Sequence, residues 1–315
     1  GGFMAVCWTD FIQGIMMFFA IVIVPAFAMY VMGGVETSLN AIDIVNPTFF
    51  NPFMNPDGST ISFIAFISLM GWGLGYFGQP HILVRFMAIS STSELKRSKR
   101  IAVGWYSISM IAAVFVGMVG NVYLTEPLNG PDVEKVLLIM TEKLFDPFVG
   151  GLILSAVLAA IMSTASSQLL VAASAFSQDF YRSVIRQDAS HTELVWVSRA
   201  AVLIISAMAI SLAMNPNSFI LEMVAYAWAG FAATFGPAVL MSLFWRRTTR
   251  NGVLAGIVVG GVTVLVWKQL ALFGLYEIIP GFFFGLLAIY IVSLLDKEPS
   301  KEITDLFDAV ERSNI

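Results

Sequence analysis

Eight long apolar runs dominate this chain of 315 residues and limit what it can fold into. A helix that crosses a bilayer needs about 20 mostly apolar residues. Only 12% of the residues are charged, against about 25% in an ordinary soluble domain. Lipid must therefore be the solvent for most of the chain, and we predict an all-α polytopic membrane protein. The predicted spans are 11–31, 62–83, 101–124, 148–176, 195–214, 219–244, 253–272 and 278–295.

The basic residues are unevenly divided between the loops that join these spans. If the spans alternate in direction, 14 of the 17 Lys and Arg residues fall on one side, and only Lys135, Lys143 and Lys268 fall on the other. By the positive-inside rule the basic side is cytoplasmic. We therefore expect a transmembrane domain over 1–295 and a cytoplasmic tail over 296–315, with a tight turn at 215–218.

The tail carries a short amphipathic pattern. Its apolar residues follow the i, i+3, i+4, i+7 spacing of one helical face: Ile303, Leu306, Phe307 and Val310. Because the polar face is acidic, docking on the inner surface of the protein is favoured over lying on the membrane.

Several function classes lack the residues that they need. The single cysteine, Cys7, excludes an intrachain disulfide framework, and two separated histidines give little material for a zinc site or a catalytic triad. The net charge of −4 argues against nucleic acid. The spans contain no catalytic dyad, so we expect no enzyme, and no obligate protein partner is evident. The chain opens without an initiator methionine, which favours an internal fragment of a longer protein.

The second predicted span contains "GWGLGYFGQPH", residues 71–81, with four glycines and a proline. Glycine and proline weaken a helix by about 1 and about 3 kcal/mol relative to alanine. Freed backbone groups find no water in lipid, so such a break must be buried in protein or line a cavity. Transporters bind small polar solutes at breaks of this kind. We predict that α-helical hydrogen bonding is lost between Gly71 and Gln79.

Trp72, Tyr76 and Pro80 lie four residues apart within this stretch, which places them on one helical face. An indole wall and a phenol hydroxyl suit a small amphipathic solute. The alternative is that the small residues only allow close helix packing. The presence of Gln79 and His81 in the same run favours a binding site.

The fourth predicted span contains "AAIMSTASSQLL". The hydroxyls of Ser163 and Thr164 and the carbonyl of Ala160 share one face, and neutral oxygens suit a hard cation such as Na⁺. Bonding of each hydroxyl to its own i−4 carbonyl, or helix packing, is the stronger alternative on spacing alone.

Asp10 is the acid at the inner end of the first predicted span. We interpret it as a helix cap, because Thr9 and Asp10 precede the long apolar run; a place on an ion's exit path is the alternative. In the sixth predicted span, "AYAWAGFAATFGPAV" indicates a bendable helix that either gates or packs.

Several blocks resemble the sodium/solute symporter family: "GWGLGYFGQPHILVRFMA", "LAAIMSTASSQLLVAASAFSQDFYR", "ELVWVSR", "AYAWAGFAATFGPAVL" and "RNGVLAG" with "GLYEIIPG". The resemblance covers residues 1 to about 299. It implies a LeuT-like five-plus-five inverted-repeat fold, with substrate and sodium near the midplane. Residue 1 falls just before the last helix of the first repeat, the second span opens the second repeat, and the last two spans are peripheral. The first broken helix is then missing, so the chain by itself is not expected to transport.

The resemblance also assigns roles by position. Trp72, Tyr76 and Pro80 match positions that line the substrate site, and Ser167 matches a cysteine position near the substrate. Ala160, Ser163 and Thr164 match sodium ligands, and Asp10 matches an acid implicated in sodium handling. The implied activity is uptake of L-proline coupled to sodium. Another small amino acid or a carboxylate, or a transporter-like sensor domain, remains an alternative.

Overall fold

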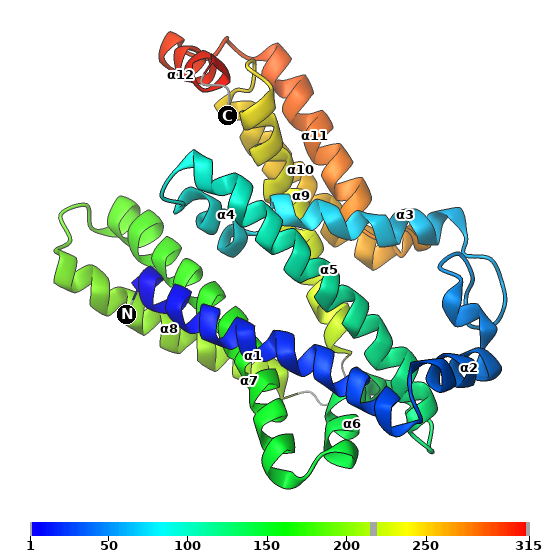
Figure 1. Cartoon of the computed structure of the whole chain (residues 1–315). Coiled ribbons are helices and arrows are strands. Elements are labelled where there is room, and N and C mark those ends of the chain that lie inside the picture. Colours follow the sequence, from blue (N-terminus) through cyan, green and yellow to red (C-terminus); the bar gives the residue numbers. More distant parts are fainter. Residues whose placement is uncertain (1, 215–218, 313–315) are drawn as a thin grey trace. The chain divides into compact units, whose positions relative to one another are not determined.

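The computed structural model describes residues 2–214 and 219–312, and these residues are almost entirely helical (Figure 1). The α-helices are α1 Gly2–Val31, α2 Val35–Val45, α3 Phe63–Gly71, α4 Pro80–Met87, α5 Thr92–Tyr123, α6 Val136–Leu144, α7 Pro147–Ser174, α8 His191–Ala213, α9 Ile220–Phe244, α10 Arg250–Leu270, α11 Ile278–Leu295 and α12 Lys301–Arg312. Tighter or wider helical segments are η1 Pro47–Phe50, η2 Trp72–Phe77, η3 Gly130–Lys135, η4 Ala175–Ile185 and η5 Leu272–Gly274.

The predicted spans correspond to these helices. Seven described helices are long and apolar enough to cross a membrane: α1, α5, α7 with η4, α8, α9, α10 and α11. The remaining predicted span, 62–83, is divided into α3, η2 and α4, so the predicted break between Gly71 and Gln79 is confirmed. The turn predicted at 215–218 lies outside the described residues.

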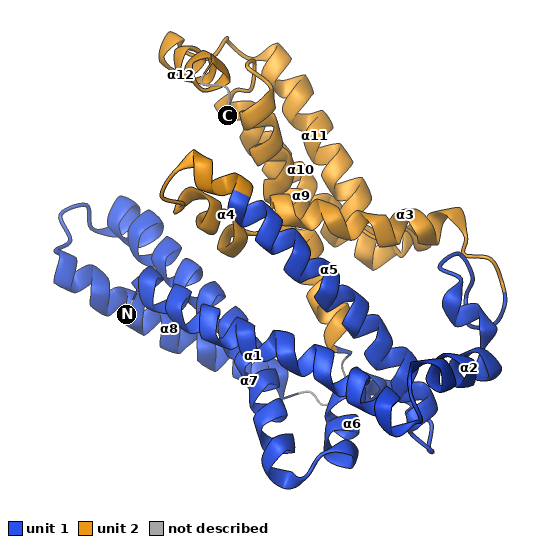
Figure 2. Ribbon diagram, in the orientation of Figure 1, with its two compact units in different colours: residues 1–58, 97–219 blue, residues 59–96, 220–315 orange. Residues whose placement is uncertain are grey.

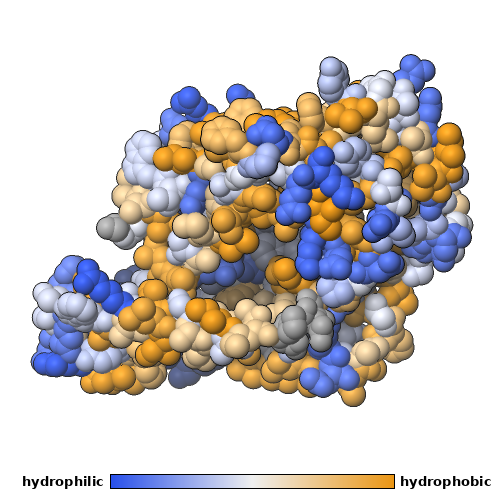
Figure 3. Space-filling view, turned by 90° about the horizontal axis from the view of Figure 1, so that it is seen from below, coloured by the Kyte–Doolittle hydropathy of each residue, from blue (hydrophilic) through white to orange (hydrophobic). Residues whose placement is uncertain are grey.

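Large apolar side chains are exposed along the spans, as a lipid environment requires. Leu203 is 72% exposed and Phe283 is 60% exposed. Figure 3 shows apolar side chains over much of the face that it presents, with hydrophilic side chains gathered in separate patches. A water-soluble protein rarely exposes contiguous apolar surface on this scale.

The chain divides into two compact units (Figure 2). The first contains residues 1–58 and 97–219, and α1 packs against α7 within it. Its core joins four helices through side chains with no solvent exposure: Val24 and Ala28 of α1, Ile42 of α2, Val119 of α5 and Met140 of α6.

The second unit contains residues 59–96 and 220–315. Its helices α9, α10 and α11 pack closely because small residues line the contacts. A Cβ built on Gly260 of α10 would overlap the carbonyl of Ala233 in α9, and one built on Gly256 would overlap Ile289 in α11. Small residues at such positions let membrane helices approach closely and gain van der Waals contact. This contact drives their association, because lipid provides no hydrophobic effect between the helices.

The first helix begins earlier than predicted. It starts at Gly2, so Thr9 and Asp10 lie inside it, and the Thr9 hydroxyl donates to the carbonyls of Ala5 and Val6. The interpretation of Asp10 as a cap is therefore wrong. The residues before it, "GFMAVCW", contain no helix breaker after Gly2 and continue the helix backwards.

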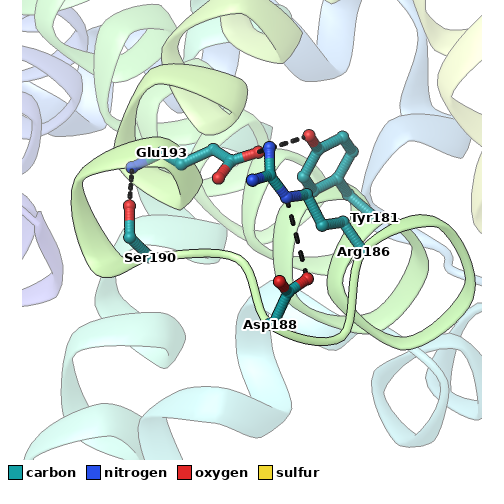
Figure 4. Close-up of polar contacts among 5 residues, drawn as sticks. All are labelled: Tyr181, Arg186, Asp188, Ser190 and Glu193. Atoms are coloured by element: carbon teal, nitrogen blue, oxygen red, sulfur yellow. Dashed lines mark hydrogen bonds and ion pairs between the residues drawn. The ribbon is translucent and has the colours of Figure 1, made fainter.

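A group of polar side chains closes the turn between η4 and α8 (Figure 4). Glu193 accepts from the Tyr181 hydroxyl at 2.7 Å and from Arg186 at 2.9 Å, while its own backbone N–H donates to the Ser190 hydroxyl at 3.2 Å. Arg186 also lies 3.7 Å from Asp188. The Ser190 contact caps the start of α8, so these side chains fix the end of the α7–η4 helix to the next helix.

The tail helix forms as predicted and is attached to the protein, while most of its apolar face is exposed. Ile303, Leu306 and Val310 are all more than half exposed, and Phe307 is half-buried. The attachment is through the opposite, polar side of the helix. Arg246, just after α9, donates to both carboxylate oxygens of Asp308, at 2.7 and 2.9 Å. The two parallel hydrogen bonds fix the orientation of the contact.

Candidate functional site

The break in the second predicted span belongs to the second unit. Helix α3 ends at Gly71, a 3₁₀ segment runs from Trp72 to Phe77, and α4 begins at Pro80. Between them Gln79 is extended, with φ −85° and ψ 110°. Proline at the first position of a helix has no N–H to leave unsatisfied and is disfavoured in a helix interior. The chain therefore ends one helix and starts another without crossing as a single rod.

Trp72 and Tyr76 of this segment meet on a tryptophan of α9. The Trp72 ring stacks on Trp228 with centroids 5.5 Å apart and planes inclined by 15°. The Tyr76 ring meets Trp228 edge-on at 5.1 Å and 85°. Pro80, predicted to share their face, instead begins the next helix and is half-buried. A 3₁₀ helix has three residues per turn, so the four-residue spacing does not keep all three on one face.

Trp228 makes polar contacts to the same segment. Its indole N–H donates to the backbone carbonyl of Trp72 at 2.9 Å, and its own carbonyl accepts from the Gln79 side chain at 3.3 Å. Gln79 is buried, with 3% of its surface exposed. Trp228 could not be selected from its sequence context, because "AYAWAGF" is one apolar run with small residues.

Two glycines of the break make room for α9. A Cβ built on Gly75 would overlap the indole of Trp228, and one built on Gly78 would overlap the carbonyl of Phe231. No atom lies within 4 Å of a Cβ built on Gly73. Close packing against α9 and loss of α-helical hydrogen bonding therefore occur in the same stretch.

The predicted sodium ligands lie in the first unit, on the uninterrupted helix α7. Ala160 and Ser163 are half-buried and Thr164 is exposed. Among residues 2–214 and 219–312, neither the Ser163 nor the Thr164 hydroxyl makes a hydrogen bond. Other hydroxyls in the spans do bond their own i−4 carbonyl: Ser155 to Gly151, Thr234 to Gly230 and Thr263 to Val259. The Ser163 and Thr164 hydroxyls differ from these three, because neither bonds its own i−4 carbonyl in the described part of the chain.

Asp10 and Ser167 lie together where α1 packs on α7. The Ser167 hydroxyl donates to Asp10 Oδ2 at 3.2 Å, and Ser167 is 5% exposed. The hydroxyl of the adjacent residue, Ser166, donates at 3.1 Å to the carbonyl of Ser163, about one turn earlier. Ser167, assigned to the substrate by resemblance, therefore contacts the acid assigned to sodium. Gln13, one turn beyond Asp10, is a polar neighbour that the sequence did not single out.

Two cavities are found within single units, and neither contains a predicted site residue. One, of about 350 Å³, is lined by residues of α5, α6 and the loop between them, including Gly120, Asn121 and Val136. The other, of about 460 Å³, is apolar and lies between α4 and α9, against Leu83, Phe86 and Val239. Neither cavity identifies the substrate. The candidate sites therefore remain the aromatic rings at the break and, separately, the hydroxyls of α7.

A match to the description "Sodium:solute symporter family" extends over residues 1–260. The chain belongs to this family. It is 48% identical to the "High-affinity proline transporter PutP" of Bacillus subtilis, over 98% of this chain and 64% of that protein. It is 47% identical to the "Sodium/proline symporter" of Escherichia coli, over 98% of this chain and 61% of that protein. The chain thus spans a little over three fifths of the length of these relatives.

A solved structure shares the fold. It is described as the substrate-bound outward-open state of a Na⁺-coupled sialic acid symporter, and it matches with a TM-score of 0.74 at 20% identity, over 96% of this chain and 64% of that one. The expected all-α, LeuT-like membrane fold is confirmed by this likeness. At this identity the likeness carries the fold alone.

Proposed function

We propose that the complete protein is a secondary active transporter that carries L-proline into the cell together with sodium. The observation that carries this proposal is the broken segment, where Trp72 and Tyr76 meet on Trp228. The names of relatives at 47% and 48% identity point to the same solute.

The aromatic group fits the chemistry of proline. Proline has an apolar ring, a secondary ammonium and a carboxylate. Aromatic faces stack against apolar rings and attract cations, and the ends of helices at a break offer backbone groups to the charged ends. Tyr76 is 38% exposed, so part of this residue remains accessible to a solute. We assign Trp72, Tyr76 and Pro80 to the substrate, and we assign Ser167 to the substrate by resemblance alone.

Sodium is assigned to α7. A sodium ion that loses part of its hydration shell needs replacement oxygens, and the Ser163 and Thr164 hydroxyls with the Ala160 carbonyl supply three. Support comes from these hydroxyls remaining unpaired among the described residues while Ser155, on the same helix, bonds its own turn. Asp10 is placed on the ion's path, because its carboxylate lies beside Ser167, one turn along α7.

We infer a multi-pass location in the bacterial inner membrane, with residues 296–315 as a cytoplasmic tail that follows a transporter domain over 1–295. The basic residues Arg246, Arg247 and Arg250 lie between α9 and α10, and Arg246 holds the tail helix. The positive-inside rule puts this loop and the tail on the cytoplasmic side. No enzymatic step is part of the proposal.

The test is uptake of labelled L-proline by the complete protein reconstituted in vesicles. An inward sodium gradient should drive accumulation, and an equal potassium gradient should not. A panel of unlabelled amino acids and carboxylates, added in excess, then identifies the solute. Strong competition by proline alone supports the proposal. Absence of sodium-driven uptake of labelled proline, or stronger competition by another solute than by proline, contradicts it.

A further inference from the structure

We infer that Trp228 of α9 is a positioning residue of the substrate site, which holds the broken segment in shape and forms its third aromatic wall. This inference rests on the proposed function, because it concerns the same site. It adds a residue from α9 to the residues of the break that are assigned to the substrate, and it gives that residue two separable roles.

The first role is to satisfy the backbone where α-helical bonding is lost. The carbonyl of Trp72 opens the 3₁₀ segment, and the indole N–H of Trp228 donates to it at 2.9 Å. The Gln79 side chain, at the other end of the break, donates to the Trp228 carbonyl at 3.3 Å. A backbone polar group inside a membrane needs a partner from the protein. One residue of α9 therefore ties both ends of the break.

The second role is to set the size of the aromatic site. The Trp228 ring is seated where Gly75 has no side chain, and its faces and edge contact Trp72 and Tyr76. A ring held by a hydrogen bond, a backbone recess and two aromatic contacts is a fixed wall rather than a side chain that swings in and out. The distance between the Trp228 wall and the substrate's ring then limits which rings fit.

The inference also explains why a glycine stands at position 75. Gly73 and Gly75 both lie in the 3₁₀ segment, but only at Gly75 would a Cβ overlap the indole. Alanine at either position removes one glycine from the break, whereas alanine at 75 also displaces Trp228. The two substitutions form a matched pair that separates backbone freedom from the tryptophan contact.

A second matched pair separates the indole N–H from a general loss of tryptophan. Trp267 of α10 also donates its indole N–H to a backbone carbonyl, that of Leu275, at 3.2 Å. Trp267→Phe measures what the loss of such a bond costs elsewhere in the same unit. Trp228→Phe removes the corresponding bond at the break and shortens the wall.

The experiment compares four variants of the complete protein in vesicles at matched protein amounts: Trp228→Phe, Gly75→Ala, Trp267→Phe and Gly73→Ala. Initial rates of labelled proline uptake at saturating sodium give KM and the maximal rate. Competition by pipecolate, which has one more methylene in its ring than proline, gives the selectivity for ring size. Sodium dependence is measured at saturating proline.

We expect Trp228→Phe to raise the proline KM at least fivefold over Trp267→Phe, and Gly75→Ala to do so over Gly73→Ala. Trp228→Phe should also bring pipecolate at least threefold closer to proline in competition, because the shorter wall admits the larger ring. The sodium requirement should move by less than twofold.

Three results overturn the inference: KM and ring selectivity equal to those of the controls, a change confined to maximal rate or protein amount, or a lower proline KM in Trp228→Phe, which would make Trp228 an obstruction. If the unsubstituted protein shows no sodium-driven proline uptake, the proposed function fails first and the inference fails with it. If it does transport proline, only the variants decide.

Discussion

The broken span α3–η2–α4 and the continuous span α7 place polar groups inside a membrane protein in opposite ways. In the broken span the helix itself changes, and a backbone carbonyl at Trp72 is met by a side chain from α9. In α7 the backbone stays helical from Pro147 to Ser174, and the polar groups are hydroxyls on its surface. A break suits a solute with charged ends, whereas hydroxyls on a rigid helix suit a small spherical ion.

The largest predicted difference between the two spans is the change in folding stability when a glycine is replaced by alanine. Gly78→Ala forces a Cβ against backbone atoms of α9 that cannot move aside, and overpacking of this kind costs about 3 kcal/mol of folding stability. Gly151→Ala, in α7, meets no atom within 4 Å and should stabilise the helix by about 0.5 kcal/mol. Denaturant unfolding of the purified protein measures both. Equal stability of the two variants would contradict the packing described at the break.

Loss of an aromatic wall should weaken proline binding without weakening sodium binding. Trp72→Ala and Tyr76→Ala each remove a ring that contacts Trp228, and we expect a cost of about 2 kcal/mol, roughly 30-fold in proline affinity. Equilibrium binding of labelled proline at saturating sodium is the measurement. Proline affinities within about twofold of the unsubstituted protein, for both variants, would place the site elsewhere.

Loss of a hydroxyl from α7 should act on sodium first. Ser163→Ala or Thr164→Ala should raise the sodium concentration for half-maximal uptake about fivefold, on the order of 1 kcal/mol per lost ligand. Ser155→Ala is the matched control, because that hydroxyl bonds its own turn at 2.7 Å. An unshifted sodium curve for both variants at matched membrane abundance would leave these hydroxyls with a packing role alone.

The polar contacts at the end of α7–η4 should matter less. Glu193→Gln weakens the ion pair with Arg186, whose side chain is 54% exposed, but keeps an oxygen for the Tyr181 hydroxyl. An exposed pair of this kind contributes little to stability. We expect a small loss of stability, reduced further at high salt, with unchanged sodium dependence. Thermal unfolding with and without salt measures it, and a loss as large as that of Gly78→Ala would contradict a minor role for this contact.

The smallest effect on transport should come from the tail. Its hydrogen bonds and charge interaction with Arg246 hold the pKa of the Asp308 carboxyl below its usual range. A lowered acid pKa means that the attachment is complete above about pH 4 and is lost as pH falls through the lowered pKa. A spin label at position 306 should therefore become more mobile in acid, and Asp308→Asn should show that mobility at neutral pH with unchanged uptake. The attachment would be contradicted if the label in the unsubstituted protein at neutral pH were as mobile as it is in acid or in Asp308→Asn.

The sequence predicted more of the spans than of their contacts. Hydropathy located the spans because lipid imposes a length and a composition on each one, and the glycines and Pro80 located the break. Trp228 was not predictable, since nothing in the sequence distinguishes it from Trp245 or Trp267 before α9 is packed against residue 75. The cap interpretation of Asp10 fails because α1 begins at Gly2, before the apolar run 11–31. The side by which the tail helix attaches was not predictable, because the contact joins Asp308 to Arg246, which is distant in the sequence.

The central claim is that the broken span holds proline while α7 holds sodium, and a crossed titration of Tyr76→Ala and Thr164→Ala tests it most directly. Coupling between two ligands is reciprocal, so Thr164→Ala should weaken proline binding at low sodium. Proline affinity is measured for both variants at low and at saturating sodium. The account predicts that saturating sodium restores the affinity of Thr164→Ala to nearly that of the unsubstituted protein and leaves Tyr76→Ala weak. Recovery of both variants, or of neither, would contradict the separation of the two sites.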